Sequence, residues 1–422
     1  MKILLTLAFI LTSLTSYSQN LSVLSNKADS LYNSANFSDA ARLYRKLGQL
    51  TEFKLNKKNM YYNAACSYAL AGFSREALEV LDSAVMVFNY SNTVHMKKDT
   101  DLNSIKETVE YKKLVEAAEK KRPSRSNKIE VVKLVTDDIK NFWNAYDKVQ
   151  LEPNKITEIY RREYFGKASP GLEDYQALRI GSIENFVFNQ QKNAKYYAGI
   201  RRNTENINEQ TKQIYKSFYK LKEIYADAVF PDVYFVIGRL NSAGTTSDNG
   251  LLIALDQMAY SENVDVSGFT ESKRQMIKHT NDLPNLVAHE LIHYQQDKMN
   301  QNQSLLGQVI REGMADFIAE LISGKSLNFD LDNYTQGKEK ELYRLFVSEM
   351  DGTDYKNWLF NYGEDRGGKP ADLGYWLGRE ICRSYYENQT DKKQAILDML
   401  TIQDYQDFLV KSKYAEKINY RN

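Results

Sequence analysis

Val287-Ala288-His289-Glu290-Leu291-Ile292-His293-Tyr294 carries an HExxH motif in an apolar, helix-compatible stretch and decides how the second half of the chain is interpreted. Two histidines four residues apart project from one face of a helix, so His289 and His293 can reach the same metal ion. Zinc prefers neutral imidazole, and a catalytic zinc takes three protein ligands and leaves one position for water. Glu290 lies next in sequence and can take a proton from that water. The motif predicts a zinc site, with an exposed helix that binds nothing as the alternative.

A second helical segment, residues 304–321, supplies the predicted third ligand. Its apolar residues recur at helical spacing, and Gly324 is placed to cap its C-terminal end. Glu312 and Asp316 share one face, which suits Glu312 as the carboxylate that completes a His2Glu zinc site. Asp316 is then placed to accept the other ring N–H of a metal-bound histidine. The alternative is a solvated acidic face, but Gly313 weakens a helix and indicates a close approach between two backbones.

The two motifs together resemble those of gluzincin metallopeptidases. His289-Glu290-x-x-His293 is followed, after eighteen residues, by Glu312-Gly313-Met314-Ala315-Asp316. This resemblance implies that the two histidines and Glu312 bind zinc and that Glu290 is the general base. The gap is similar to that of the aminopeptidase branch, but the chain has no upstream Gly-x-Met-Glu-Asn segment, so exopeptidase action is not supported. The chain resembles in particular bacterial predicted Zn-dependent proteases, over about its last 200 residues.

The residue that would stabilise the oxyanion is less well defined. Thermolysin-like gluzincins use a downstream histidine for this role, and this chain has no histidine after His293. Residues 374–380 form a predicted helical stretch with two glycines four apart, and a Gly-Tyr-containing helix lies near the cleft in the resembled proteases. We therefore predict that Tyr375 donates a hydrogen bond to the oxyanion. Tyr362 and Arg379 are rivals, and a packing role for Tyr375 is the alternative.

Two apolar runs before the motif predict strands in an otherwise helical region. Val233–Gly238 and Leu251–Asp256 have strand composition, and residues 241–250 between them are typical of a loop. The gluzincin resemblance implies that the second run is an edge strand along which an extended peptide lies. The alternative is a simple buried hairpin. Helical apolar spacing over residues 131–149 and 208–226 predicts helices before these runs.

The N-terminal part of the chain predicts a helical repeat. Ala35–Tyr44 echoes Ala71–Val80 at an offset of 36 residues, and a third, degenerate unit is expected over residues 102–120. The offset is close to the period of tetratricopeptide repeats, which this segment resembles over two units. Such a stack binds a protein or peptide partner, or it is a spacer that supports the catalytic part, and both interpretations remain open. The charged, proline-containing residues 121–128 predict a linker.

The N-terminus and the composition limit location and class. A lysine, a short apolar run and small residues before Gln19 predict a cleaved secretory signal peptide. That run is too short for a stable membrane span. A net charge of +1 indicates neither nucleic acid nor an anionic membrane as a partner. Cys66 and Cys382 lie in no CxxC pattern, so we expect two buried free thiols.

These features predict a mainly helical chain with an α+β catalytic part. The expected order is a signal peptide over residues 1–18, tetratricopeptide-like repeats over 19–120, a linker over 121–128 and a zincin-like metallopeptidase domain with a small β-sheet over 129–422. The predicted function is an exported, periplasmic or extracellular, Zn2+-dependent peptidase that acts on peptide or protein substrates. Two alternatives stay open: a repeat-based binding protein with a structural or vestigial zinc site, and a zinc hydrolase of non-peptide amides.

Overall fold

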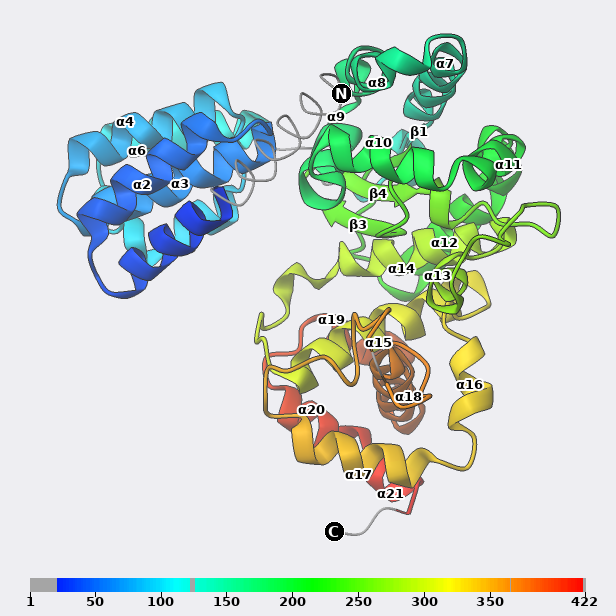
Figure 1. Ribbon diagram of the computed structural model, residues 1–422. Coiled ribbons are helices and arrows are strands. Elements are labelled where there is room, and N and C mark those ends of the chain that lie inside the picture. The colour runs from blue at the N-terminus through cyan, green and yellow to red at the C-terminus, as the bar shows by residue number, and fades with distance from the viewer. Residues whose placement is uncertain (1–20, 122–125, 365, 420–422) are drawn as a thin grey trace. The chain divides into compact units, whose positions relative to one another are not determined.

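The computed structural model describes residues 21–121, 126–364 and 366–419. The predicted signal peptide and the centre of the predicted linker lie outside these residues. The described residues form two compact units, residues 21–121 and, apart from residues 176–178, residues 126–419, and each unit is described by itself (Figure 1). Helices dominate the described residues, and one small sheet lies in the second unit, which confirms the predicted mainly α fold with a small β-sheet.

The first unit is built from helices joined by tight turns. The turns before its second and fourth helical segments match, because Asn36 N–H donates to the carbonyl of Leu31 and Phe73 N–H donates to the carbonyl of Tyr68. Small side chains let the helices approach closely, and eight alanines of the core are fully buried: Ala28, Ala40, Ala41, Ala64, Ala65, Ala77, Ala84 and Ala118. The tetratricopeptide assignment itself stays a prediction. The helical segments are residues 21–33, α2 (Phe37–Leu50), α3 (Lys54–Leu70), α4 (Ser74–Asp82), α5 (Thr93–Lys98) and α6 (Val109–Lys121).

The second unit surrounds its sheet with helices and adds a helical C-terminal part. The strands are β1 (Leu134–Val135), β2 (Val233–Val236), β3 (Gly244–Ser247) and β4 (Gly250–Ala254). The helices before the sheet's last strands are α7 (Asp137–Leu151), α8 (Ile156–Glu163), α9 (Pro170–Tyr175), α10 (Ile183–Lys192), α11 (Ala194–Glu205) and α12 (Thr211–Ile224). After the sheet come α13 (Glu271–Met276), α14 (Leu283–His293), α15 (Leu305–Ser323), α16 (Asp330–Thr335), α17 (Glu339–Glu349), α18 (Leu373–Asn388), α19 (Lys392–Leu400), α20 (Tyr405–Ser412) and α21 (Tyr414–Lys417).

The sheet corrects two sequence predictions. Its strand order is β1-β2-β4-β3, with β2 and β4 parallel and β3 antiparallel to β4. The expected loop over residues 241–250 therefore contains the edge strand β3, and the run expected at the edge forms the inner strand β4. The hairpin alternative is also wrong, because the two apolar runs pair in parallel. Every residue of β2 and β4 is buried, which explains their continuous apolar sequence.

The short strand β1 also corrects the predicted helix over residues 131–149. Leu134 and Val135 pair in parallel with Val233 and Tyr234, and the helix begins only at Asp137. A strand of two residues leaves no periodic pattern that could be separated from the helix that follows it. The remaining predicted helices of the second unit are confirmed, including α14 and α15 with Ser304 as N-cap and Gly324 as left-handed C-cap.

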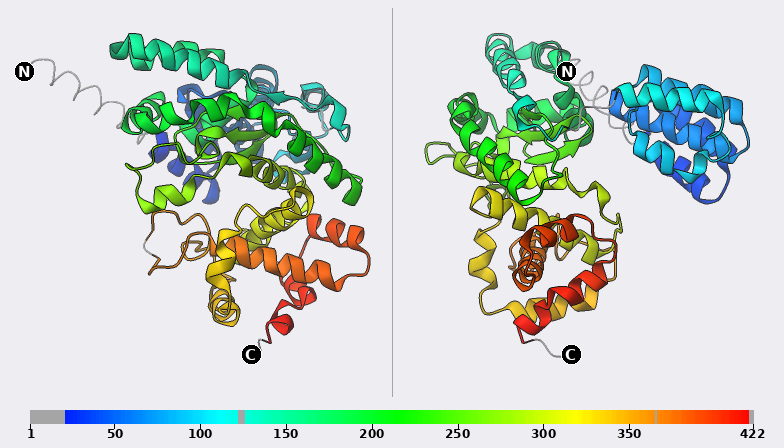
Figure 2. Two further views of the ribbon diagram at one scale, coloured as in Figure 1. Left: turned by 90° about the vertical axis from the view of Figure 1, so that its right-hand side faces the viewer. Right: turned by 180° about the vertical axis from the view of Figure 1, so that it is seen from behind.

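The helices α14, α15 and α18 form the part of the core that matters for the site. α15 packs against both α14 and α18, and α14 packs against β3 and β4. Figure 1 shows α14 directly beside the sheet, and Figure 2 shows the same helices from two further sides. At the crossing of α15 and α18, a Cβ on Gly313 would lie 2.1 Å from the backbone carbon of Gly378. The close backbone approach predicted from Gly313 is thus confirmed.

Two further findings concern the whole described chain. Cys66 and Cys382 are buried free thiols, as predicted. None of the helices within the described residues combines the length and the apolar character that a membrane-spanning helix requires.

Candidate metal centre

The HExxH motif occupies the last two turns of a buried helix. α14 begins at Leu283 with Pro284 in its first turn, where a missing N–H leaves no hydrogen bond unmade. The exposed fraction is only 4% for His289 and 7% for Glu290. The helix is apolar almost all round and is enclosed by neighbouring elements, so its few polar side chains are held inside the unit. Burial of two ionisable side chains, with partly buried His293 beside them on one short helix, requires partners for them.

Glu312 of α15 meets the two histidines of α14. The Nε2 atoms of His289 and His293 lie 3.0 Å apart. Glu312 Oε2 lies 3.2 Å from the Nε2 atom of His293 and 3.7 Å from that of His289. Ligand atoms about 2.0 to 2.1 Å from a tetrahedral zinc are separated from each other by about 3.3 Å. The three atoms predicted to bind the metal therefore converge at the spacing that a zinc ion needs.

The neighbours of His293 define which ring nitrogen faces the other ligands. Its Nδ1 atom lies 2.9 Å from Gln296 Oε1, and the amide nitrogen of Gln296 donates to the carbonyl of Arg311. Because an amide oxygen only accepts, Nδ1 of His293 carries the proton and Nε2 presents its lone pair. A hydrogen-bonded second nitrogen is typical of metal-bound histidine. Gln296 was not predicted, although its position three residues after His293 places it within reach.

Within the described residues, no fourth histidine, cysteine, aspartate or glutamate completes the group. Among the described histidine, cysteine, aspartate and glutamate residues, only His289, His293 and Glu312 bring their ligand atoms within 4.8 Å of one another at this place. Structural zinc normally has four protein ligands, whereas catalytic zinc has three and an open position. The donor set thus fits a catalytic rather than a structural zinc.

The pKa values of the two carboxyl groups of the site, Glu290 and Glu312, shift in opposite directions. Burial raises the pKa of Glu290 above its ordinary value, and His293 and His289 only partly offset this effect. Burial acts in the same direction on Glu312, but there the two histidines hold the pKa of the carboxyl far below its ordinary value. Glu312 is therefore charged, as a metal ligand must be, whereas Glu290 has a raised pKa, which makes it easier for this carboxylate to accept a proton.

The edge strand β3 reaches the candidate base. A Cβ on Gly244 would lie 2.3 Å from Glu290 Oε1, so only glycine leaves room for this carboxylate beside the strand. The sequence pattern did not identify Gly244, because the segment around it was expected to be a loop. The contact places the free edge of the sheet next to Glu290.

The contacts of Asp316 do not include the predicted hydrogen bond to a ligand histidine. Asp316 accepts hydrogen bonds from the hydroxyl of Ser326 and, at 3.3 Å, from the N–H of Leu327, and Arg379 lies 3.6 Å away. The Nδ1 atom of His289 is buried and has no hydrogen-bond partner among the described residues. The expected hydrogen bond between Asp316 and a ligand histidine is thus not formed here. Ser326 and Arg379 contact both the carboxylate and each other, and these partners could not be predicted from the sequence of α15 alone.

Tyr375 lies at the site, and its two rivals do not. Its ring centroid is 6.0 Å from that of His289, and burial, followed by the charge of Glu312, raises the pKa of its hydroxyl. Arg379 is 1% exposed and forms ion pairs with the carboxylates of Asp316, Glu320, Asp332 and Glu380. The charged neighbours of Tyr362 are Asp372, Arg366 and Asp330, none of which is a predicted ligand. Geometry therefore favours Tyr375 over both rivals.

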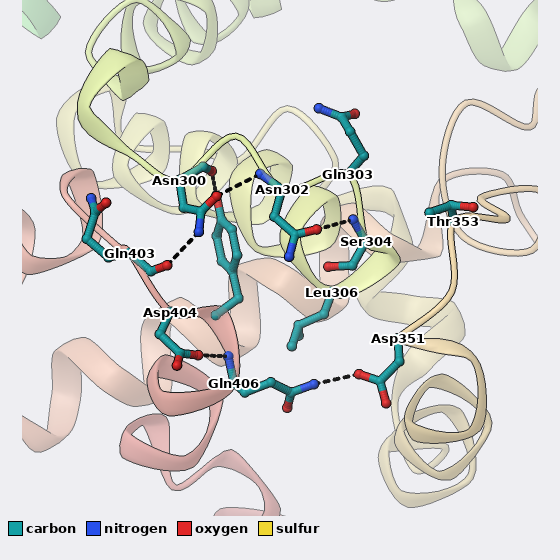
Figure 3. Close-up of a pocket in the computed structure, with 11 residues that line it drawn as sticks. Asn300, Asn302, Gln303, Ser304, Leu306, Asp351, Thr353, Gln403, Asp404 and Gln406 are labelled. Atoms are coloured by element: carbon teal, nitrogen blue, oxygen red, sulfur yellow. Dashed lines mark hydrogen bonds between the residues drawn. The ribbon is translucent and has the colours of Figure 1, made fainter. Parts of the chain in front are cut away.

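A hollow of about 460 Å³ in the second unit lies apart from these residues. It is lined by residues of the segments 300–306, 351–353 and 403–406, and no predicted site residue lines it. Figure 3 shows that its polar side chains bond to one another and to nearby backbone, as in the contact between the amide of Gln406 and the carboxylate of Asp351. The hollow is therefore no part of the candidate metal centre.

Comparison with known proteins agrees with this geometry. Residues 264–405 match the family described as Predicted Zn-dependent protease (DUF2268). The matched segment is about a third of the chain and contains α14, α15 and α18, and with them every predicted site residue. No curated protein and no solved structure is significantly similar to the chain. The match supports a zinc-dependent protease as the class of protein.

Proposed function

We propose that this protein is a zinc-dependent peptidase in which His289, His293 and Glu312 hold the metal. The convergence of their three ligand atoms on two different helices carries the proposal. The open fourth position and the match to a family of predicted Zn-dependent proteases support it. When bound, zinc would supply Lewis-acid chemistry, by lowering the pKa of water and polarising the scissile carbonyl.

Glu290 and Tyr375 would carry the protein's own part of the reaction. Glu290 takes the proton of the attacking water and passes it to the leaving amine, which requires a carboxyl group that both accepts and releases a proton. Its burial raises the pKa of this group toward the neutral range and so favours that exchange. Tyr375, whose ring lies beside that of His289, would turn its hydroxyl to the oxyanion of the tetrahedral intermediate.

The free edge of β3 supports peptides as the substrates. An extended peptide can add to an exposed strand edge through main-chain hydrogen bonds. A peptide bound along this edge would lie near Glu290, because that side chain is next to Gly244 of β3. Simple non-peptide amides could not use this edge, so we expect peptides to be cleaved faster in a panel that contains both.

Export and partner binding complete the proposal. Residues 1–18 would direct the protein to the periplasm or the outside of the cell. The helical first unit would bind a protein partner or act as a spacer. A repeat-based binding protein with a vestigial site remains the competing function, and zinc content separates the two.

We expect purified wild-type protein to contain about one zinc per chain and the Glu312→Ala variant to contain far less, because a three-ligand site loses its only carboxylate. Elemental analysis of both proteins after dialysis against zinc measures this. Glu320→Ala, on the same helix, is the matched control and should keep wild-type zinc content.

Absence of zinc from wild type, even after zinc is added, would contradict the proposed site. Equal zinc in wild type and Glu312→Ala would exclude Glu312 as a ligand. Circular dichroism of each variant shows whether a loss of zinc follows from a loss of the fold.

We expect Tyr375→Phe to lower kcat about 100-fold and to leave KM and zinc content near wild type. Removal of one oxyanion donor costs about 100- to 1000-fold in kcat, and the low end applies because zinc shares the role. Steady-state kinetics with a peptide substrate measure the change. Unchanged turnover would assign Tyr375 to packing, and Tyr386→Phe, on the same helix, is the control for loss of a hydroxyl.

A further inference from the structure

An arginine without a counter-charge stands at the edge strand. Arg179 is exposed, and its Nη2 atom donates to the hydroxyl of Thr245 on β3 over 2.9 Å. Among the residues that the structure describes, no carboxylate lies within 4.0 Å of the Arg179 guanidinium. Some other arginines of the same unit do have such partners, as Arg201 has in Asp147 and Arg161 in Glu184. Arg179 is therefore a positive group that is positioned but not neutralised.

The backbone at Arg179 is held in place by two hydrogen bonds from side chains of one neighbouring segment. The amide nitrogen of Asn241 donates to the carbonyl of Arg179 over 2.7 Å, and the Nε atom of Arg239 donates to the carbonyl of Ile180 over 2.8 Å. Asn241 and Arg239 belong to the segment that leads from β2 into β3. The arginine is thus fixed relative to the edge strand, which lowers the entropy that a ligand must overcome on binding.

The register of the sheet shows which face Arg179 serves. Thr245 pairs with Leu252, which pairs with Tyr234, so these three side chains share one face of the sheet. Tyr234 touches Gly171 of α9, whereas the next residue along β3, Gly244, faces Glu290 of α14. Figure 1 shows α9 and α14 on opposite sides of the sheet. Arg179 therefore meets Thr245 on the face turned away from Glu290.

A peptide that pairs with β3 would bring one side chain to Arg179. Directly opposed residues in a sheet project their side chains to the same face. The substrate residue opposite Thr245 would thus project toward Arg179, and its neighbours opposite Gly244 and Thr246 would project toward α14. Because Gly244 touches Glu290, the residue opposite Thr245 lies within about two positions of the scissile bond.

We infer that Arg179 forms a subsite for a carboxylate, so that the substrates are peptides with an acidic group within about two residues of the cleaved bond. The carboxylate comes either from an aspartate or glutamate side chain or from the C-terminus of the peptide. A guanidinium forms charge-assisted, two-pronged hydrogen bonds with either group. This inference rests on the proposed function for the location of the scissile bond, but not for the binding of the acidic group.

Binding tests the subsite without hydrolysis. Fluorescein-labelled alanine- and glycine-based peptides carry one glutamate at a central position, and matched peptides carry glutamine there. Each is made with a free or an amidated C-terminus. Anisotropy measures their binding to the zinc-loaded Glu290→Gln variant with and without Arg179→Gln. We call a peptide acidic if it has the carboxylate that Arg179 binds, and neutral if it has glutamine and an amidated C-terminus. We expect Arg179→Gln to weaken binding of acidic peptides about 10-fold and to leave neutral peptides unaffected. This is the low end for a hydrogen bond to a charged group, because Arg179 is exposed.

The pattern of loss identifies the source of the carboxylate. A loss confined to glutamate peptides assigns an acidic side chain, and a loss confined to free C-termini assigns the terminal carboxylate. Arg202→Gln, an exposed arginine of α11, is the control and should change neither. Equal binding of acidic and neutral peptides, equal losses on Arg179→Gln, or no binding of any peptide would overturn the inference.

Hydrolysis separates the subsite from the proposed activity. If wild type cleaves none of these peptides but binds acidic ones through Arg179, the subsite stands and the proposed peptidase function fails. If wild type cleaves acidic and neutral peptides at the same kcat/KM, and Arg179→Gln changes neither value, the peptidase function stands and the subsite fails.

Discussion

Glu290→Gln is expected to abolish peptide hydrolysis, with kcat at least about 1000-fold below wild type, and to leave zinc content unchanged. General acid–base catalysis raises the rate of a reaction about 100- to 10,000-fold. Here one buried carboxylate would both accept the proton of the water and donate it to the leaving amine. Glutamine has the same shape, so it preserves the contact with Gly244 and the packing of α14. The amide cannot accept the proton of the attacking water.

The measurement pairs turnover of a quenched fluorescent peptide with elemental analysis of the same preparation. Glu271→Gln, an exposed glutamate of α13 within the family-matched segment, is the matched control and should hydrolyse at the wild-type rate. Wild-type turnover by Glu290→Gln would remove this residue from the base role. Loss of zinc together with activity would instead assign it to the architecture of the metal centre.

Periodicity and motif spacing predicted the elements that carry the metal ligands. α14, α15 and α18 are long, show clear apolar spacing or caps, and bear the residues His289, His293, Glu312 and Tyr375, which the fold brings together. Glu312 could be chosen because helical spacing fixes which side chains share a face. Helical spacing does not predict which side chains on different helices contact each other. Asp316 turns to Ser326 and Arg379, and only the tertiary packing decides between these partners and His289.

The parts of the site near the sheet were missed for a different physical reason. β3 has four half-buried residues and lies at an edge, so it has no apolar run, and its glycine and polar residues resemble those of a loop. Gly244 and Arg179 matter only because β3 lies beside β4 and α14, and a sequence pattern does not show which strands are neighbours. Parallel pairing of β2 with β4 likewise depends on the long segment between them.

Gly313→Val is expected to lower the free energy of unfolding of the second unit by more than about 3 kcal/mol and to remove bound zinc. Inserting atoms into a packed core costs about 1 to 3 kcal/mol, and more when the obstacle cannot move. Here the obstacle is backbone, because a Cβ on Gly313 would lie 2.1 Å from Gly378 carbon and 2.2 Å from the amide nitrogen of Arg379. A gain in helix propensity of a few tenths of a kcal/mol for valine over glycine cannot compensate.

Urea denaturation and zinc analysis of Gly313→Val measure both effects, with Gly268→Val as control. Gly268 has no atom within 4 Å of its Cβ position and should change stability by less than about 1 kcal/mol. The two readouts are linked because Gly313 follows Glu312 on α15, and Gly378 lies one turn after Tyr375 on α18. Separation of the helices would therefore move a metal ligand and the proposed oxyanion donor in opposite directions. A stable Gly313→Val protein with full zinc content would mean that the site does not depend on this contact, and that α14 and α15 alone define the metal centre.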